Sequence, residues 1–384
     1  MEFQPANRIA SVPKNFFAKL DQVVAGLPDQ AAVIDLTKGN PDLRTPEPIV
    51  KALQHASTEF ENDRYTDVAG KASLRQAIAQ YYQRLYGVIV DPDTQILATN
   101  GSCISLSALP QVFLNPGDYV ITTDPCYPEY YATVAQAGGK LYQLPINEAN
   151  HFLPDLDSVP DEILSKARIL LLNYPNNPTG ATATTAFFQQ AIAFGRQHHL
   201  LVVNDFAYAA IGFDQAPISI LAQPGATDVA IELNTLSKTY NMAGWRVGYT
   251  LGNASAMSAL KAYHEHTYST IYGAVQDAAI VGLRGNQASV AAIRKTYQQR
   301  RDVMCAGLDT LGWHYVLPQG AFYLWIHAPE GLSGDVFTQL LLQQVQVVVA
   351  PGIGFGAEGQ YYVRISLTQP LTVLETVLQR FRQV

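Results

Sequence analysis

Residues 235–249 read Thr-Leu-Ser-Lys-Thr-Tyr-Asn-Met-Ala-Gly-Trp-Arg-Val-Gly-Tyr. Lys238 stands among hydroxyl side chains, and Arg246 is flanked by glycines. Burial and a nearby cation both lower the pKa of a lysine, which favours the neutral amine that forms an imine with an aldehyde. The planar fork of Arg246 and the hydroxyls of Thr235 and Ser237 are suited to bind a phosphate. The stretch therefore predicts a site for a phosphorylated aldehyde, and the alternative is a surface lysine beside a glycine turn.

A second part of the phosphate site is predicted near residue 100. Residues 95–100 form a strand pattern that runs into Gly101, Ser102 and Cys103, and residues 104–114 continue as an apolar helix. A helix that begins on such a turn presents unpaired N–H groups and the positive end of its dipole to an anion. These three residues are therefore expected to face the phosphate beside Thr235 and Arg246.

Two further strands end in polar residues. Residues 167–173 and 200–204 have the continuous apolarity of strands that are buried on both faces. After the first strand, a turn rich in Pro and Asn fixes the backbone, so that Asn177 can aim its amide at one point. Asp205 ends the second strand, where a carboxylate is costly unless it meets a cation, and Tyr208 follows it.

Three more residues have the chemistry of ligand contacts. Tyr127 lies between two prolines, which restrict its backbone and suit its ring to stacking on a flat ligand. Gly39 follows a short strand and can bring its backbone close to a ligand. Arg364 belongs to the apolar strand 361–367, where a guanidinium is costly unless a carboxylate meets it. A packed loop tyrosine, a turn glycine and a structural ion pair are the respective alternatives.

The Lys238 stretch resembles, nearly position for position, the Schiff-base lysine motif of the class I and II aminotransferases, which use pyridoxal phosphate (PLP). The resemblance covers nearly the whole chain. It is narrowed to the LL-diaminopimelate aminotransferase-like subgroup by residues 173–180, 237–242, 297–302 and 351–356. It implies an enzyme that moves an amino group from an L-amino acid to a 2-oxo acid by a ping-pong mechanism.

The resemblance also implies a role for each candidate residue. Lys238 would hold PLP and move the proton, Asp205 would keep the pyridine nitrogen protonated, and Tyr208 would reach the phenolic oxygen, so these three are the expected catalytic residues. The expected cofactor contacts are Gly101, Ser102, Cys103, Tyr127, Asn177, Asp205, Tyr208, Thr235, Ser237, Lys238 and Arg246.

The remaining implied contacts concern the substrate and a second subunit. Arg364 would clamp the substrate α-carboxylate, with Gly39 and Asn177 beside it. Tyr65 would reach the cofactor phosphate of the neighbouring subunit. The expected assembly is therefore a homodimer with shared active sites.

The same resemblance implies an α/β chain of PLP fold type I. Its large domain, residues 46–285, would carry a mainly parallel sheet of the seven-stranded type, with the ligand outside the carboxyl ends of the strands. Residues 286–384 would form a small α+β domain, and the N-terminal arm 1–45 would complete part of it. A chain of 384 residues is long enough for two such domains.

Composition narrows the class of partner. The net charge of -7 and the absence of a Lys/Arg run argue against nucleic acid and favour a small-molecule partner. The resemblance implies that the partners are amino acids and 2-oxo acids. No apolar stretch in the sequence reaches the length of a membrane span, and a cytoplasmic enzyme is expected. The three cysteines are far apart and suggest neither a disulfide framework nor a zinc site, so no metal is expected.

The substrate prediction depends on where the chain departs from the subgroup. Cys103 and Ile104 stand where the subgroup usually has lysine and glutamate, which makes this region less polar. We expect the substrate site to have further aromatic side chains in its wall, from Phe16, Phe17 and Tyr268. We therefore predict donors with neutral, aromatic or sulfur-containing side chains, and 2-oxoglutarate as the acceptor.

Three other functions are compatible with parts of the pattern. A β-lyase on the same scaffold would release a thiol, pyruvate and ammonia without an oxo-acid acceptor. A true LL-diaminopimelate aminotransferase would follow the subgroup rather than the residues at 103 and 104. A PLP-responsive regulator would need a DNA-binding domain, for which the sequence leaves no room.

Overall fold

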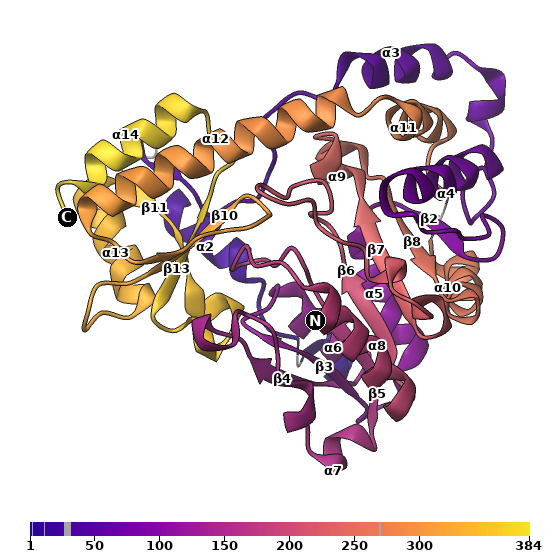
Figure 1. The fold of residues 1–384 in the computed structure, drawn as a ribbon, viewed down its shortest axis with the longest axis horizontal. Coiled ribbons are helices and arrows are strands. Elements are labelled where there is room, and N and C mark those ends of the chain that lie inside the picture. Colours follow the sequence, from indigo (N-terminus) through magenta and orange to yellow (C-terminus); the bar gives the residue numbers. More distant parts are fainter. Residues whose placement is uncertain (2, 11, 27–31, 269) are drawn as a thin grey trace.

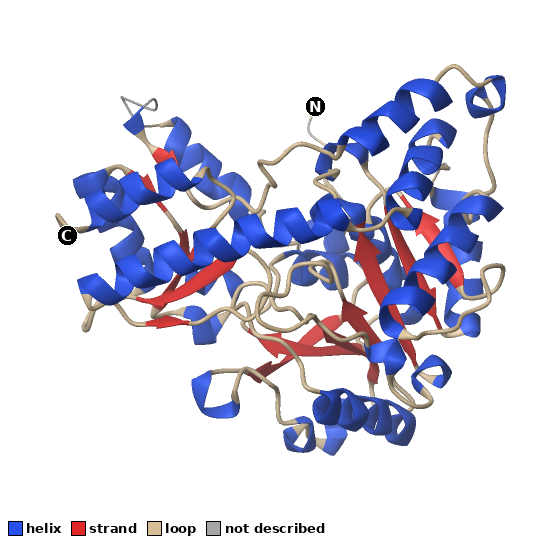
Figure 2. Cartoon of the chain, turned by 45° about the horizontal axis from the view of Figure 1, so that its top comes forward, coloured by secondary structure: helices blue, strands red, loops and turns tan. Residues whose placement is uncertain are grey.

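The computed structural model describes residues 1, 3–10, 12–26, 32–268 and 270–384 (Figures 1 and 2). Its larger sheet has seven strands; β8 runs antiparallel to its neighbours β2 and β7, and the other four neighbouring pairs are parallel. This confirms the predicted mainly parallel α/β architecture. The strand order is β2 (Ile96–Thr99), β8 (Gly248–Gly252), β7 (Ala230–Thr235), β6 (Leu201–Asp205), β5 (Ala167–Leu172), β3 (Tyr119–Asp124) and β4 (Lys140–Pro145).

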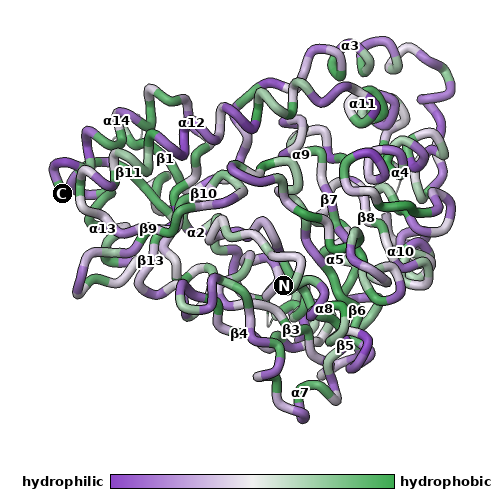
Figure 3. The backbone as a smooth tube through the Cα atoms, viewed as in Figure 1, coloured by the Kyte–Doolittle hydropathy of each residue, from purple (hydrophilic) through white to green (hydrophobic). Residues whose placement is uncertain are grey.

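Helices cover both faces of this sheet because side chains alternate along each strand. In β5, Ile169 and Leu171 belong to one hydrophobic core, whereas Leu170 and Leu172 belong to the core on the opposite face. Figure 3 shows the resulting hydrophobic colour along the central strands. The first core includes α5 (Ser102–Phe113), α6 (Glu129–Gln136) and α10 (Ala254–Thr267), and the second includes α4 (Ala72–Tyr86), α8 (Thr185–His198) and α11 (Gly273–Arg284).

A smaller antiparallel sheet forms the other part of the chain. Its strands are β12 (Ala350–Pro351), β13 (Tyr362–Ser366), β10 (Tyr323–His327) and β9 (Tyr315–Val316), in that order. It is accompanied by α12 (Ala288–Leu311), α13 (Gly334–Val345) and α14 (Leu371–Phe381) (Figure 1). Strand β1 (Ile34–Asp35) pairs in parallel with β11 (Val347–Val348), so an N-terminal segment joins this C-terminal part. The domain boundaries after residues 45 and 285 stay predictions.

The remaining helices are short or lie at the periphery. They are α1 (Asn7–Ala10), α2 (Phe16–Ala25), α3 (Glu47–Ala56), α7 (Asp161–Leu164) and α9 (Leu236–Thr239). Within the described ranges, none of the helices combines the length and the apolar character that a membrane crossing demands.

The site is positioned by the strand ends. Asp124, Asp205 and Thr235 are the last residues of β3, β6 and β7, and these three strands point the same way. Their carboxyl ends therefore meet along one edge of the sheet, which is where ligands bind in open α/β sheets.

Candidate active site

A cavity of about 470 Å³ opens at this edge. It brings together most of the residues predicted from the sequence, although they are spread over more than 300 positions of the chain. The predicted residues that line it are Gly39, Ser102, Cys103, Tyr127, Asn177, Asp205, Tyr208, Thr235, Ser237, Lys238, Arg246 and Arg364.

Lys238 lies on α9, directly after β7, and its side chain points into the cavity. Its Nζ donates a hydrogen bond of 2.7 Å to the carbonyl oxygen of Gly39. Burial, helped by the guanidinium groups of Arg246 and Arg364, lowers the pKa of Lys238 to about 8. Lys238 is therefore not the surface lysine of the alternative interpretation, and a useful fraction of it is neutral near physiological pH.

Gly39 has a steric role in addition to the hydrogen bond that its carbonyl oxygen accepts. A Cβ atom at this position would lie 1.8 Å from the hydroxyl oxygen of Tyr323. Tyr323 also lines the cavity, and its hydroxyl is 3.1 Å from that of Tyr208. A glycine thus lets the backbone approach both this tyrosine pair and Lys238.

Asp205 has one satisfied and one unsatisfied carboxylate oxygen. Its Oδ2 accepts a hydrogen bond of 2.9 Å from the hydroxyl of Tyr130. Its Oδ1 is buried and has no hydrogen-bond partner among the described residues. Burial raises the pKa of Asp205 to about 6, so a bound cation that donates an N–H would stabilise the ionised form. The protonated pyridine ring of PLP is such a donor, and the residues present fit it.

The phosphate end is assembled from two turns. Ser102 is the first residue of α5, and Gly101 before it has a φ of +92°. Gly101 does not line the cavity itself; a Cβ atom there would lie 2.4 Å from an Nη atom of Arg246. On the other side, the hydroxyl of Thr235 donates to that of Ser237 over 2.9 Å. Helix N–H groups, two hydroxyls and a guanidinium therefore face the same end, which fits a phosphate.

Arg364 is buried on β13, with only 1% of its surface exposed. One Nη donates to Oδ1 of Asn177 over 2.8 Å, and the other donates to the carbonyl oxygen of Thr37. The rings of Tyr323 and Phe355 lie 4.0 and 4.6 Å from its guanidinium carbon. Within the described ranges no carboxylate forms an ion pair with it. The structural ion pair is therefore absent, and the buried charge is available to an anionic ligand.

Tyr127 lines the cavity and meets Tyr130 edge to face, with ring centroids 5.7 Å apart. Asn177 is held by two contacts, since its backbone N–H donates to Oδ1 of Asn173 over 2.8 Å and its side-chain oxygen accepts from Arg364. The amide NH₂ of Asn177 is thereby left as the donor that a ligand in the cavity can use.

Some residues that line the cavity or support its side chains were not anticipated. Tyr130 follows Tyr127 by one helical turn, but only the folded chain reveals its bond to Asp205. Tyr323 lies in an apolar strand and reads as a packing residue. Of the predicted aromatic wall, only Phe17 lines the cavity; the prediction was wrong for Phe16, which packs on Phe17 and Phe355, and for Tyr268, which packs on Tyr263 and His264.

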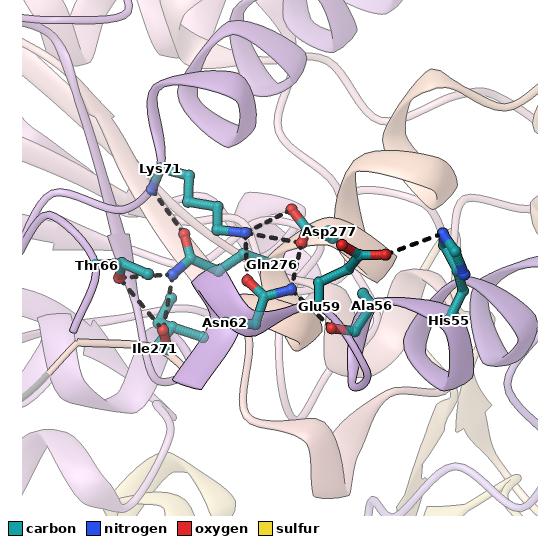
Figure 4. Close-up of polar contacts among 9 residues, drawn as sticks. All are labelled: His55, Ala56, Glu59, Asn62, Thr66, Lys71, Ile271, Gln276 and Asp277. Carbon is teal, nitrogen blue, oxygen red and sulfur yellow. Dashed lines mark hydrogen bonds and ion pairs between the residues drawn. The ribbon is translucent and has the colours of Figure 1, made fainter. Parts of the chain in front are cut away.

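Tyr65 lies outside this cavity and is 90% exposed. The base of its loop is anchored by a polar network, shown in Figure 4. Lys71 Nζ donates to Asp277 over 2.7 Å and to Oδ1 of Asn62 over 2.6 Å, and Asn62 in turn donates to Asp277 over 2.9 Å. Buried Gln276 accepts from the backbone N–H of Lys71 over 2.7 Å. The loop is thus fixed at its base, while its tyrosine is exposed and does not line the chain's own cavity.

The chain is similar to known proteins over almost its whole length. The family described as aminotransferase class I and II matches residues 31–381. An L-glutamine--4-(methylsulfanyl)-2-oxobutanoate aminotransferase of Bacillus subtilis is 42% identical, with 96% of this chain and 93% of that protein covered. An LL-diaminopimelate aminotransferase of Oleidesulfovibrio alaskensis is 41% identical, with coverages of 99% and 98%. The substrate-bound BacF structure from Bacillus subtilis has a TM-score of 0.95 at 37% identity, with coverages of 100% and 98%.

Proposed function

Because the chain belongs to the class I and II aminotransferases, which depend on PLP, we propose that this transaminase takes its amino group from L-amino acids with neutral side chains. One observation carries the proposal. Among the described residues that line the cavity, Asp205 is the only acidic one, and its free oxygen would be occupied by the pyridine nitrogen of the bound cofactor. Among these lining residues the distal ammonium of diaminopimelate would therefore find no free carboxylate, and leaving it unpaired would cost several kcal/mol.

The surroundings of Cys103 support the same substrate class. Cys103, Leu106 and Phe17 all line the cavity and present a soft, largely apolar surface. The Bacillus subtilis relative is named for an oxo acid whose side chain is a neutral thioether. Sulfur-containing donors such as methionine, and aromatic donors such as phenylalanine, fit this wall. The β-lyase alternative receives no support from the relatives, which are named as aminotransferases.

For the acceptor we propose 2-oxoglutarate. Arg364 would hold its α-carboxylate through the bidentate geometry of a guanidinium. Lys38 also lines the cavity, and its Nζ is already oriented by Asp21 at 2.7 Å. Lys38 is the proposed partner of the distal carboxylate, for which the sequence offered no clear candidate.

The proposed mechanism assigns a physical task to each residue. When bound, PLP supplies an electron sink for the charge that develops at the substrate Cα. Asp205 would keep the ring nitrogen protonated through its free Oδ1, while Tyr130 holds the other oxygen. The amine of Lys238 would take the proton from the substrate Cα and deliver it to C4′ of the cofactor. Its pKa of about 8 suits this task.

Binding and orientation fall to the remaining residues. Ser102, Thr235, Ser237 and Arg246 would hold the phosphate. Tyr127 would cover the ring, while Asn177 and Tyr208 would donate to its phenolic oxygen.

We further propose that the enzyme is a homodimer in which Tyr65 of each subunit reaches the phosphate of the other subunit's cofactor. The proposal is supported by the exposure of this tyrosine on an anchored loop, which leaves its side chain accessible to a second subunit.

A donor series tests the substrate proposal. We expect kcat/KM for methionine and phenylalanine to exceed that for aspartate and for LL-diaminopimelate, with 2-oxoglutarate as the common acceptor. A lead of LL-diaminopimelate by about tenfold, or about 1.4 kcal/mol in the transition state, would contradict it. Replacing Cys103 by lysine and Ile104 by glutamate should shift the preference toward LL-diaminopimelate, and unchanged ratios would mean that these positions do not select the donor.

A further inference from the structure

Two histidines lie side by side on the small antiparallel sheet. His314 directly precedes β9, and His327 is the last residue of β10. The backbone N–H of His327 donates to the carbonyl oxygen of His314 over 2.9 Å, so the two residues are cross-strand neighbours. Their ring centroids are 4.4 Å apart. The ring of Tyr362 lies 4.1 Å from that of His327, which limits the orientations that the imidazole can take.

A glutamate from the larger sheet points at both histidines. Glu148 follows β4, and its Oε1 lies 3.1 Å from Nε2 of His314 and 2.8 Å from Nε2 of His327. The turn that carries Glu148 is fixed by the side chain of Asn147, which accepts a hydrogen bond of 3.1 Å from the backbone N–H of Ala149. The three ligand atoms thus converge from two different parts of the chain and lie within 4.8 Å of one another.

We propose that Glu148, His314 and His327 form a site for a divalent transition metal ion such as Zn²⁺. Imidazole nitrogen and carboxylate oxygen are the ligands that zinc takes at about 2.0 to 2.2 Å, which places neighbouring ligand atoms a little over 3 Å apart in a tetrahedral site. The observed separations of 2.8 and 3.1 Å need only small side-chain movements to reach that spacing. The metal would replace the hydrogen on each Nε2.

The partial exposure of the cluster fits three protein ligands and one open position. The side chains of His314, His327 and Glu148 are 63%, 30% and 44% exposed, so water can complete the coordination. The metal would link the turn after β4 to the β9–β10 hairpin. None of the three residues lines the cavity around Lys238, so the site is separate from the catalytic one and its loss leaves basal transamination unchanged.

Zinc titration of the chelator-treated PLP enzyme, followed by calorimetry, tests the proposal. We expect one Zn²⁺ per chain and a rise in the thermal unfolding midpoint when the metal is added. Glu148→Gln and His327→Gln should each weaken binding by at least about tenfold, since even the loss of an outer partner of a metal ligand has that effect. Both variants change side chains that are at least partly exposed, so both should fold. The PLP absorbance and the basal activity check this.

The matched control is His55→Gln. His55 also pairs with a carboxylate, at 3.5 Å from Glu59, but its side chain is 81% exposed and no second histidine completes a trio there. Its replacement should leave zinc binding unchanged. No zinc binding by the wild type, or the same affinity in Glu148→Gln, His327→Gln and wild type, would overturn the proposal.

Discussion

The cavity around Lys238 and the loop that carries Tyr65 differ in how far one chain completes them. In the cavity, Lys238 donates a hydrogen bond to the carbonyl oxygen of Gly39, and Asp205 accepts one from Tyr130. Both side chains are therefore positioned by residues of the same chain. Tyr65, in contrast, projects into solvent from a loop whose base is firmly bonded. The first region assembles its residues from one chain, whereas the second presents Tyr65 for the proposed contact with another subunit's cofactor.

The two regions also depend on different forces. The cavity is held by the buried sheet beneath it, because its polar residues follow apolar strands whose packing fixes the backbone. The Tyr65 loop depends on a partly exposed polar network, in which Lys71 and Asp277 are 23% and 32% exposed. Changes in the cavity should therefore affect the reaction directly, and changes in the loop should act through the proposed second subunit.

The largest effect is expected at Lys238. Lys238→Ala removes the amine that we propose bonds the cofactor and moves the proton, so turnover should fall by at least about 10⁴-fold. Borohydride treatment of the wild type should label Lys238, as peptide mass spectrometry would detect. Lys51→Ala is the control, since Lys51 is 70% exposed and pairs only with Glu47. If Lys238→Ala retained its activity, the reaction would not take place in this cavity.

Much of the cavity follows from sequence because its residues stand next to patterns with a clear physical meaning. The apolar runs before Asn177 and Asp205 predict buried parallel strands, and parallel strands bring their ends together. The glycine-flanked Arg246 beside Lys238 predicts a phosphate site without knowledge of the fold.

Other features could not be predicted, since they depend on contacts between distant segments. Tyr130 and Asp205 are 75 positions apart, and nothing near either residue signals their hydrogen bond. Phe16 and Phe17 are adjacent and chemically identical, but only the direction of α2 decides that Phe17 alone faces the cavity. The position of Tyr65 relative to a second subunit is likewise absent from any local pattern.

A mixing experiment sharpens the comparison and should give the second largest effect. Lys238→Ala and Tyr65→Phe chains, refolded together, should recover activity because each heterodimer gains one site with neither change. Random pairing makes this roughly a quarter of all sites in a twofold dimer. The control mixes wild type with the double variant Lys238→Ala/Tyr65→Phe, whose heterodimers contain no intact site. If the control heterodimers gain activity and the first mixture does not, Tyr65 acts within its own chain.

The smallest effect is expected from the network beneath the Tyr65 loop. Asp277→Asn removes the negative charge that Lys71 contacts at 2.7 Å, and it leaves Asn62 as the remaining side-chain partner of the ammonium. Because both charged groups are partly exposed, the substitution should weaken the interaction between positions 71 and 277 by about 1 kcal/mol, which is a factor of roughly five in an equilibrium constant. If the network acts by presenting Tyr65, this weakening should appear in the dissociation constant of PLP, while kcat at saturating PLP stays near the wild-type value.

Glu47→Gln, which breaks an exposed pair on α3, should change neither quantity. Asp277→Glu should restore most of the PLP affinity, because it restores the charge. A lower thermal midpoint with unchanged PLP affinity in Asp277→Asn would show instead that the network supports only the fold of its own chain, and the contrast between a self-contained cavity and a loop built for a partner would lose its basis.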